Sequence, residues 1–255
     1  LNRGDVPACE LTVDDVVQLN CPGFGDDFVP DAFGELLGAA VGDGCITSNH
    51  DQDFLFVALG ESERAVAGQL AENVNACKRW LHEGDDRAAR PTQVTETSTG
   101  LRVATSVTTL LNRLRTYAVL DAGSEVKRFN VAVFSLDRRS HAAMLCGLFT
   151  ADGTVADYGT KSQYVSLDST SLELLRQVQL LLLGFGIKAK LYENRRALGA
   201  DSAQLPDGRG GLKQYDVRQM HSLRISRSSR VRFEQAIGFM STSAKGKPQR
   251  NQNSH

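Results

Sequence analysis

The chain contains the same nine-residue pattern twice, and this repeat restricts the folds that it can adopt. Residues 36–44 read LLGAAVGDG, and residues 145–153 read LCGLFTADG. Each copy has a leucine, a glycine two positions later, an apolar stretch and a final Asp-Gly. The repeat places Asp43 and Asp152 109 residues apart. Internal similarity of this kind indicates two structural units with the same order of elements.

The hydrophobic periodicity predicts the same elements around both copies. Each copy is predicted to be a helix that stops at its final glycine, the first one starting near Pro30 and Asp31. In the first unit we expect strands at 45–47 and 53–59, a helix at 61–81, a hairpin at 92–97 and 101–105, and a helix at 107–119. In the second unit we expect strands at 154–156 and 161–167, a helix at 171–185, strands at 187–193 and 215–225, and a helix at 228–239. The Gly-rich, charged segment 194–213 is interpreted as a loop. Each unit is thus predicted to be αββαββα, in an α+β fold class.

Composition excludes several classes of protein. Apolar residues make up 41% of the 255 residues, which is typical of a chain with a packed core. The longest apolar run, near residues 180–183, is too short to cross a bilayer, and the first residues lack a signal-peptide pattern. The five cysteines are scattered without a CxxC pair, which argues against a disulfide framework or a zinc ribbon. We therefore expect a cytoplasmic protein with no membrane partner.

Charge is distributed unevenly along the chain. Residues 1–155 carry 13 Lys and Arg against 22 Asp and Glu, whereas residues 156–255 carry 16 against 8. The basic second part is a candidate phosphate-binding surface, with an ordinary solvated face as the alternative.

The two aspartates are the candidate catalytic residues. A carboxylate at the C-terminal end of a helix is electrostatically unfavourable, because that end of the helix dipole is negative. Small residues in both helices allow close packing, which would bring Asp43 and Asp152 together unless a cation offsets their charge. Oxygen ligands suit Mg²⁺, Mn²⁺ or Ca²⁺, ions that activate water in phosphodiester hydrolysis. A single Asp-Gly after an apolar helix is commonly only a turn, but two equivalent copies favour a functional pair.

The two segments resemble the LAGLIDADG motif of homing endonucleases, in the single-chain form with two motif copies. The second copy is close to the consensus, and the first has Val41 at a position that varies in the family. The resemblance covers about residues 30–247. It implies two units related by a pseudo-two-fold axis, motif helices at their interface, and antiparallel sheets that form a saddle over DNA. It also implies a monomer that cuts both strands of a long asymmetric site, acting at the nucleoid.

The resemblance further implies the ligands and catalytic lysines. Asp43 and Asp152 would bind Mg²⁺ with the carbonyls of Gly42 and Ala151; Mn²⁺ would substitute, and Ca²⁺ would bind without supporting cleavage. One lysine per active site is expected. Lys127, in a Lys-Arg-Phe-Asn stretch that resembles one in intein-borne members, is the first, and Lys245 is preferred to Lys247 as the second.

The domains expected from this resemblance are an extension or intein remnant (1–30), a first half (31–135), a second half (136–247) and a polar tail (248–255). Residue 1 is not a nucleophile and the chain does not end in His-Asn, so we expect an intein-associated but excised or free-standing nuclease without splicing activity.

Polar faces of the predicted strands are the candidates for reading DNA, because alternate residues of a strand share a face. Arg and Lys pair with guanine, Gln pairs with adenine, and Thr contacts the thymine methyl group. The candidates are Gln93, Thr95, Thr97, Arg102, Lys188, Lys190, Asp216, Arg218, Ser222 and Arg224. Further phosphate contacts are expected from Arg195, Arg196, Arg209 and Arg230.

Two other functions remain open from the sequence. One is a cleavage-inactive LAGLIDADG protein that binds nucleic acid or acts as an RNA-splicing maturase; the presence of both acids favours cleavage. The other is a small-molecule α/β enzyme, which lacks support because the sequence has no GxGxxG, GxxxxGK[ST] or GxSxG pattern.

Overall fold

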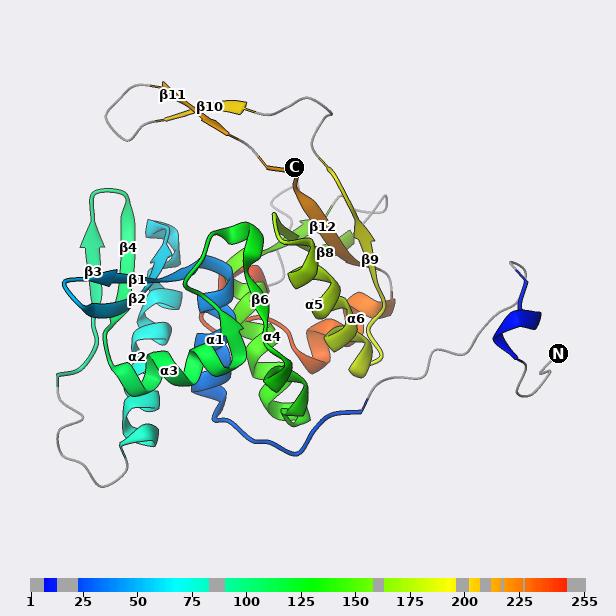
Figure 1. Ribbon diagram of the computed structural model, residues 1–255, viewed down its shortest axis with the longest axis horizontal. Coiled ribbons are helices and arrows are strands. Elements are labelled where there is room, and N and C mark those ends of the chain that lie inside the picture. Colours follow the sequence, from blue (N-terminus) through cyan, green and yellow to red (C-terminus); the bar gives the residue numbers. More distant parts are fainter. Residues whose placement is uncertain are drawn as a thin grey trace, which may run out of the picture.

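The computed structural model describes residues 7–12, 23–82, 90–157, 163–195, 202–206, 212–216, 218–226 and 228–246. Two units with the same order of elements lie side by side (Figure 1). The first comprises α1 (Asp31–Asp43), β1 (Gly44–Asn49), β2 (Gln52–Leu59), α2 (Arg64–Leu81), β3 (Val94–Thr97), β4 (Gly100–Thr105) and α3 (Thr108–Tyr117). The second comprises α4 (Arg138–Asp152), β7 (Gly153–Asp157), β8 (Gln163–Ser169), α5 (Leu172–Gly184), β9 (Ala189–Tyr192), β12 (His221–Ser226) and α6 (Ser228–Ala236). The predicted αββαββα order is confirmed in both units.

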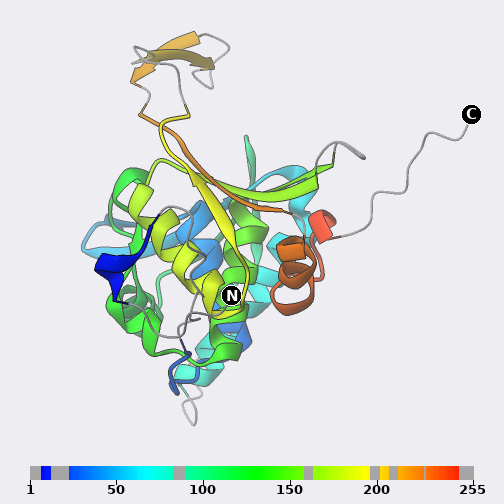
Figure 2. The same ribbon diagram turned by 90° about the vertical axis from the view of Figure 1, so that its right-hand side faces the viewer.

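The two sheets have the same topology. Both are antiparallel, with strand orders β1-β2-β4-β3 and β7-β8-β12-β9, so each strand of one sheet has a counterpart in the other. Along the inner strands, alternate residues are fully buried against the helices, among them Leu55, Val57, Leu223 and Ile225. The helices lie on one side of the sheets and leave the other side open, as Figure 2 shows from a second direction.

Glycines allow α1 and α4 to touch through their backbones. A Cβ atom on Gly38 would lie 1.9 Å from the carbonyl oxygen of Met144, and one on Gly147 would lie 2.1 Å from that of Glu35. Both distances are far shorter than a van der Waals contact. The close approach predicted from the small residues is therefore confirmed, and it holds the C-terminal ends of the two helices together.

Each of these helices ends at the predicted glycine. Gly44 and Gly153 have φ of −95° and −72°, so both are extended rather than left-handed, and both begin a strand. A Cβ on Gly44 would lie 2.6 Å from Cα of Ala40, and a Cβ on Gly153 would lie 2.2 Å from the carbonyl oxygen of Phe149. Glycine is required here because the strand turns back tightly over the last helical turn.

The segment between the two units and the chain before α1 pack together. The connection contains β5 (Ala118–Val119), a 3-10 turn (Ser124–Val126), β6 (Arg128–Phe129) and a second 3-10 turn (Val131–Ser135). Residues 23–30 run alongside it, with a bridge between Asp27 and Leu136. The buried hydroxyl of Ser140 accepts from the amide of Val29 and donates to its carbonyl. Part of the predicted N-terminal extension is thus packed against the start of α4.

Two predictions for the second unit are wrong. Segment 194–213, interpreted as a loop, contains β10 (Ser202–Pro206), which pairs with β11 (Leu212–Asp216) in a hairpin that projects from the sheet (Figure 1). The predicted single strand 215–225 is two strands, β11 and β12, because the chain leaves the sheet between them. None of the helices among the described residues has the length and apolarity to cross a membrane.

Candidate functional site

The side chains of Asp43 and Asp152 meet at the junction of the two units, where they share a hydrogen bond. They are the last residues of α1 and α4, so the packing of the two helices brings them together. Burial, followed by the negative charge of Asp43, raises the pKa of Asp152 to about 7. Burial, followed by the charge of Glu63, also raises the pKa of Asp43. The pair is therefore held in a state that favours a shared proton or a bound cation.

Two lysines, the buried Lys127 and the half-buried Lys245, flank the pair. Lys127 is 8% exposed, and its ammonium donates a 2.7 Å hydrogen bond to the carbonyl of Gly42. Lys245 donates to the carbonyls of Thr150 and Ala151, at 2.6 and 2.8 Å. Burial lowers the pKa of both lysines, and the nearby carboxylates oppose that effect. Each lysine thus contacts the last turn of one motif helix.

The structure brings six sequence-predicted residues to this site: Asp43, Asp152, Lys127, Lys245, Gly42 and Ala151. The carbonyls of Gly42 and Ala151 both accept from a lysine, and a carbonyl oxygen has a second lone pair for another partner. Lys247, the less preferred candidate, lies outside the described residues.

Glu63 is a site residue that the sequence prediction missed. It lies in a 3-10 turn (Glu61–Glu63) that leads into α2, and it lines a small cavity with Asp43, Ala151 and Met240. Its charge raises the pKa values of Asp43 and Lys245. The start of α5 in the second unit carries Ser171 instead, whose hydroxyl donates to the carbonyl of Lys127 at 2.6 Å. The first unit therefore has a carboxylate where the second has a hydroxyl.

The donors at the junction fit a hard divalent cation. Asp43 and Asp152 provide carboxylate oxygens in contact, and Gly42 and Ala151 provide carbonyl oxygens. The described residues contain no set of three or more His, Cys, Asp or Glu side chains placed to hold a metal. Burial is the main cause of the raised pKa of both carboxyl groups, and a cation between them would offset the cost of burying their negative charges.

A cleft of about 980 Å³ opens beside Asp152 on the second unit. Its lining includes Asp152, Lys245, Thr154, Arg230 and Glu234. Arg230, predicted to contact phosphate, donates to Glu234 at 2.8 Å, and its Nη1 is buried without a hydrogen-bond partner. The cleft thus gives access to Asp152 from the surface.

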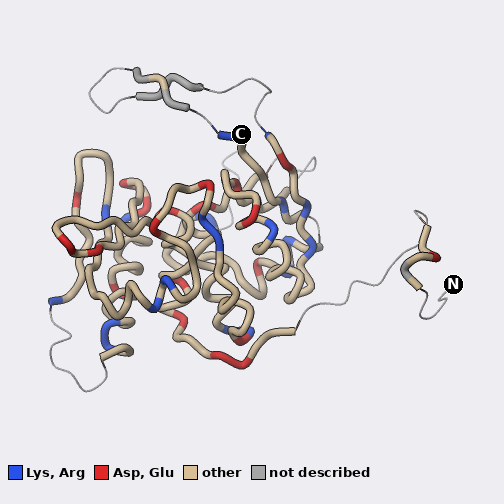
Figure 3. Tube along the Cα trace, in the orientation of Figure 1, with Lys and Arg blue, Asp and Glu red and all other residues tan. Residues whose placement is uncertain are grey.

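The open face of the second sheet carries cations and tyrosines. The guanidinium of Arg224 on β12 lies 4.7 Å from the ring centre of Tyr164 on β8 and 5.0 Å from that of Tyr192 on β9. Lys190 and Arg195 lie over the same Tyr192 ring, at 5.0 and 5.7 Å. Figure 3 shows several Lys and Arg positions in the second unit.

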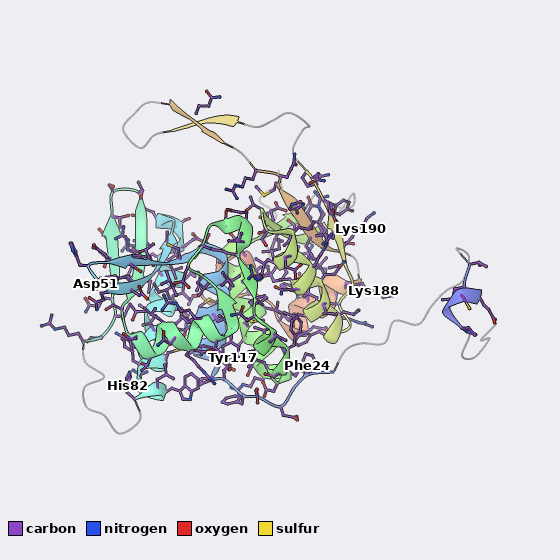
Figure 4. All side chains as sticks on the ribbon, in the orientation of Figure 1. Phe24, Asp51, His82, Tyr117, Lys188 and Lys190 are labelled. Carbon is purple, nitrogen blue, oxygen red and sulfur yellow. The ribbon has the colours of Figure 1, made fainter. Side chains whose placement is uncertain are left out.

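Other candidates in the second unit differ from their predicted positions. Lys188 is exposed and immediately precedes β9, and Figure 4 shows Lys188 and Lys190 at the outer edge of this unit. Asp216 ends β11 and therefore does not continue the face of Arg224.

Arg218 lies outside the strands and forms an ion pair with Glu125. Ser222 lies on β12 but is only 4% exposed. Arg196 and Arg209 lie outside the described residues.

The open face of the first sheet is more apolar. Arg102 on β4 lies 5.1 Å from the ring centre of Phe56, which stacks on Phe54 with ring centres 5.8 Å apart. Thr95 pairs with Arg102 across the strands and is exposed, as is Gln93 just before β3. The hydroxyl of Thr97 donates a hydrogen bond to the carbonyl of Gly100. The two phenylalanines were not predicted as part of this face.

Comparisons with known proteins agree with this architecture. A family model for the LAGLIDADG-like domain matches residues 139–238. The structure of the homing endonuclease I-WcaI bound to its DNA recognition sequence has a TM-score of 0.53 at 13% identity, covering 85% of this chain and 86% of that one.

Curated relatives match shorter segments. Ribonucleoside-diphosphate reductase NrdEB subunit alpha of Bacillus subtilis (strain 168) is 38% identical over 103 residues, which are 40% of this chain and 9% of that protein. The ribonucleoside-diphosphate reductase large subunit of Invertebrate iridescent virus 6 is 29% identical over 153 residues, 60% of this chain and 15% of that protein. This chain therefore spans only a small part of the length of these relatives.

The fold and the site define a protein of two matched α+β units with paired carboxylates at the helix interface. Residues 139–238 match the LAGLIDADG-like domain, and the chain as a whole has the fold of the homing endonuclease I-WcaI.

Proposed function

We propose that this protein is a metal-dependent homing endonuclease that binds a long duplex DNA site and hydrolyses one phosphodiester bond in each strand. The observation that carries the proposal is the hydrogen-bonded pair of Asp43 and Asp152, flanked by Lys127 and Lys245. Two units in one chain provide two half-site surfaces and two sets of catalytic groups, so a monomer suffices.

The residues of the site have complementary roles in this proposal. Asp43 and Asp152, with the carbonyls of Gly42 and Ala151, hold Mg²⁺ or Mn²⁺. When bound, the ions supply an activated water and stabilise the leaving oxygen. Lys127 and Lys245 place positive charge beside the carboxylates, where it can orient water or stabilise charge that develops on the scissile phosphate. Ca²⁺ would occupy the same ligands without supporting the reaction.

DNA binding is supported by the two open sheet faces and by the basic charge of the second unit. I-WcaI, which has the same fold, is bound to its DNA recognition sequence. In this chain, Arg102, Thr95 and Gln93 of the first unit, and Arg224 and Lys190 of the second, are the described side chains best placed to read bases. Association with an intein or host gene is supported by the short shared segment within a much longer reductase subunit.

The test is incubation with a library of duplexes in Mg²⁺ and, separately, in Ca²⁺. We expect cleavage at one long site in Mg²⁺ and binding without cleavage in Ca²⁺. Asp43→Asn and Asp152→Asn should each abolish double-strand cleavage while the circular dichroism spectrum is retained. Asp51→Asn is the matched control: Asp51 is exposed, lies in the β1–β2 turn with φ of 62°, and asparagine tolerates that conformation (Figure 4).

The second candidate is a LAGLIDADG protein that binds DNA or RNA without cutting it, such as a splicing maturase. Binding of the duplex library without cleavage in either Mg²⁺ or Mn²⁺ would favour this candidate. Cleavage that persists in both asparagine variants would show that the carboxylate pair is not the catalytic centre.

A further inference from the structure

We propose that Arg224 reads a guanine in the major groove of the second half-site, and that Tyr164 and Tyr192 hold its guanidinium in the reading orientation. The inference rests on the proposed function, and it assigns one base of the target to one side chain.

The position of Arg224 on the sheet favours a base rather than a phosphate. β12 is an inner strand, between β8 and β9, so Arg224 lies in the middle of the open face rather than at its rim. Its neighbours along the strand, Leu223 and Ile225, are fully buried, which directs Arg224 to the opposite, open side. A duplex laid across this face presents base edges to its centre and phosphates to its margins.

Tyr164 on β8 and Tyr192 on β9 each lie diagonally across from Arg224, towards opposite ends of β12. Tyr164 is paired with Ser226 on one side of Arg224, and Tyr192 is paired with Ser222 on the other. The guanidinium therefore lies between two rings, 4.7 and 5.0 Å from their centres. Its Nε is buried and has no hydrogen-bond partner among the described residues, so stacking rather than hydrogen bonding orients this end of the group.

Charge around Arg224 also favours a ligand edge rich in hydrogen-bond acceptors. Lys190 lies directly across from Arg224 on β9, and both cations contact the ring of Tyr192. Within the described part of the chain, neither of these two cations forms a salt bridge with a carboxylate. The remaining donors of Arg224 are thus available, and a planar guanidinium with two parallel donors matches the O6 and N7 acceptors of guanine.

The experiment is selection of bound duplexes from a randomised library without divalent metal, followed by sequencing. For the wild-type protein we expect one position in the second half-site at which guanine is preferred by about 5- to 150-fold. Arg224→Gln should remove that preference, or change it to adenine, at this position alone. Arg139→Gln is the matched control, because Arg139 pairs with Asp31 at the far end of α4.

Tyrosine variants test the orienting role separately. Tyr192→Leu should weaken the guanine preference at the same position, and Tyr192→Phe, which keeps the ring, should retain it. A base profile that is unchanged in Arg224→Gln, or weakened equally at every position, would overturn the assignment while leaving DNA binding intact. Recovery of no preferred duplex by the wild-type protein would overturn the proposed function, and this inference with it.

Discussion

The ammonium of Lys127 lies 2.7 Å from the carbonyl oxygen of Gly42, 85 residues earlier in the chain. Lys127 lies in the segment that joins the two units, and its side chain reaches the last turn of the first motif helix. Lys245, near the other end of the described chain, does the same at Ala151. The hydrogen-bonded carboxylates thus lie between two cations that come from equivalent positions of the two units, which balances charge at a buried junction.

Glu63 adds a negative charge on the side of the junction where Asp43 and Lys245 lie. Replacing Glu63 with Gln removes a negative charge that raises the pKa values of Asp43 and Lys245, so both pKa values should fall. Carboxyl and ammonium titrations by NMR in the metal-free protein would measure the change. Glu61→Gln is the control, because Glu61 lies in the same turn but pairs with Arg64 at the surface. Unchanged titration of Asp43 in Glu63→Gln would show that the two carboxylates do not interact.

The raised pKa of Asp152 predicts how stability depends on pH. A carboxyl group with a higher pKa in the folded than in the unfolded chain stabilises the fold at low pH. That stabilisation is lost as pH rises from the unfolded value of 3.8 towards about 7. In metal-free buffer, the free energy of unfolding should therefore fall across this window, by roughly 2–4 kcal/mol.

The isosteric variant Asp152→Asn checks the cause of that pH dependence. Because asparagine carries no charge at any pH in this window, most of the decline should disappear, and the variant should be more stable than the wild type at pH 8. Thermal melts between pH 4 and 8 in a chelating buffer would measure this. A decline of equal size in Asp152→Asn and in the exposed control Asp51→Asn would assign it to other groups.

The sequence predicted the parts of this molecule that depend on local patterns. The helices that carry Asp43 and Asp152 were predicted because both motifs have helical spacing and end in Asp-Gly, and their close packing followed from Gly38 and Gly147. Lys127 and Lys245 were selected through the family resemblance rather than from spacing, because neither lies near a motif in the sequence.

The missed features depend on tertiary packing. Glu63 is 20 residues beyond Asp43 in an ordinary acidic turn, and only the fold brings it to the junction. The alternation of Tyr215 to Ile225 continues across a break between β11 and β12, so periodicity alone extended the strand too far. The β10–β11 hairpin was missed because its Gly-rich, charged surroundings are typical of a loop.

A pair of glycine variants tests the helix contact. Gly38→Ala places a methyl group 1.9 Å from the carbonyl of Met144, so the helices must separate, and we expect destabilisation of about 3 kcal/mol or more. Gly68→Ala is the matched comparison, because Gly68 lies inside α2 and its added Cβ meets nothing within 4 Å. That change should stabilise the protein by about 0.5–1 kcal/mol through helix propensity. Urea unfolding would give both values, and equal effects would contradict the packing argument.

Removal of one ammonium group tests whether the lysines act on the reaction. Lys127→Met deletes a charge that lowers the pKa values of Asp43 and Asp152, so both carboxyl pKa values should rise. Loss of one electrostatic contact to the reacting phosphate is expected to slow strand cleavage by about 100-fold.

Because Lys245 remains on the other side, nicked plasmid should accumulate before linear product in a time course. Arg176→Met, which removes an exposed cation of α5 that pairs with Glu193, should leave both strands cut at the wild-type rate. Equal slowing of both strands in Lys127→Met, or no slowing, would show that the two lysines do not serve separate strands.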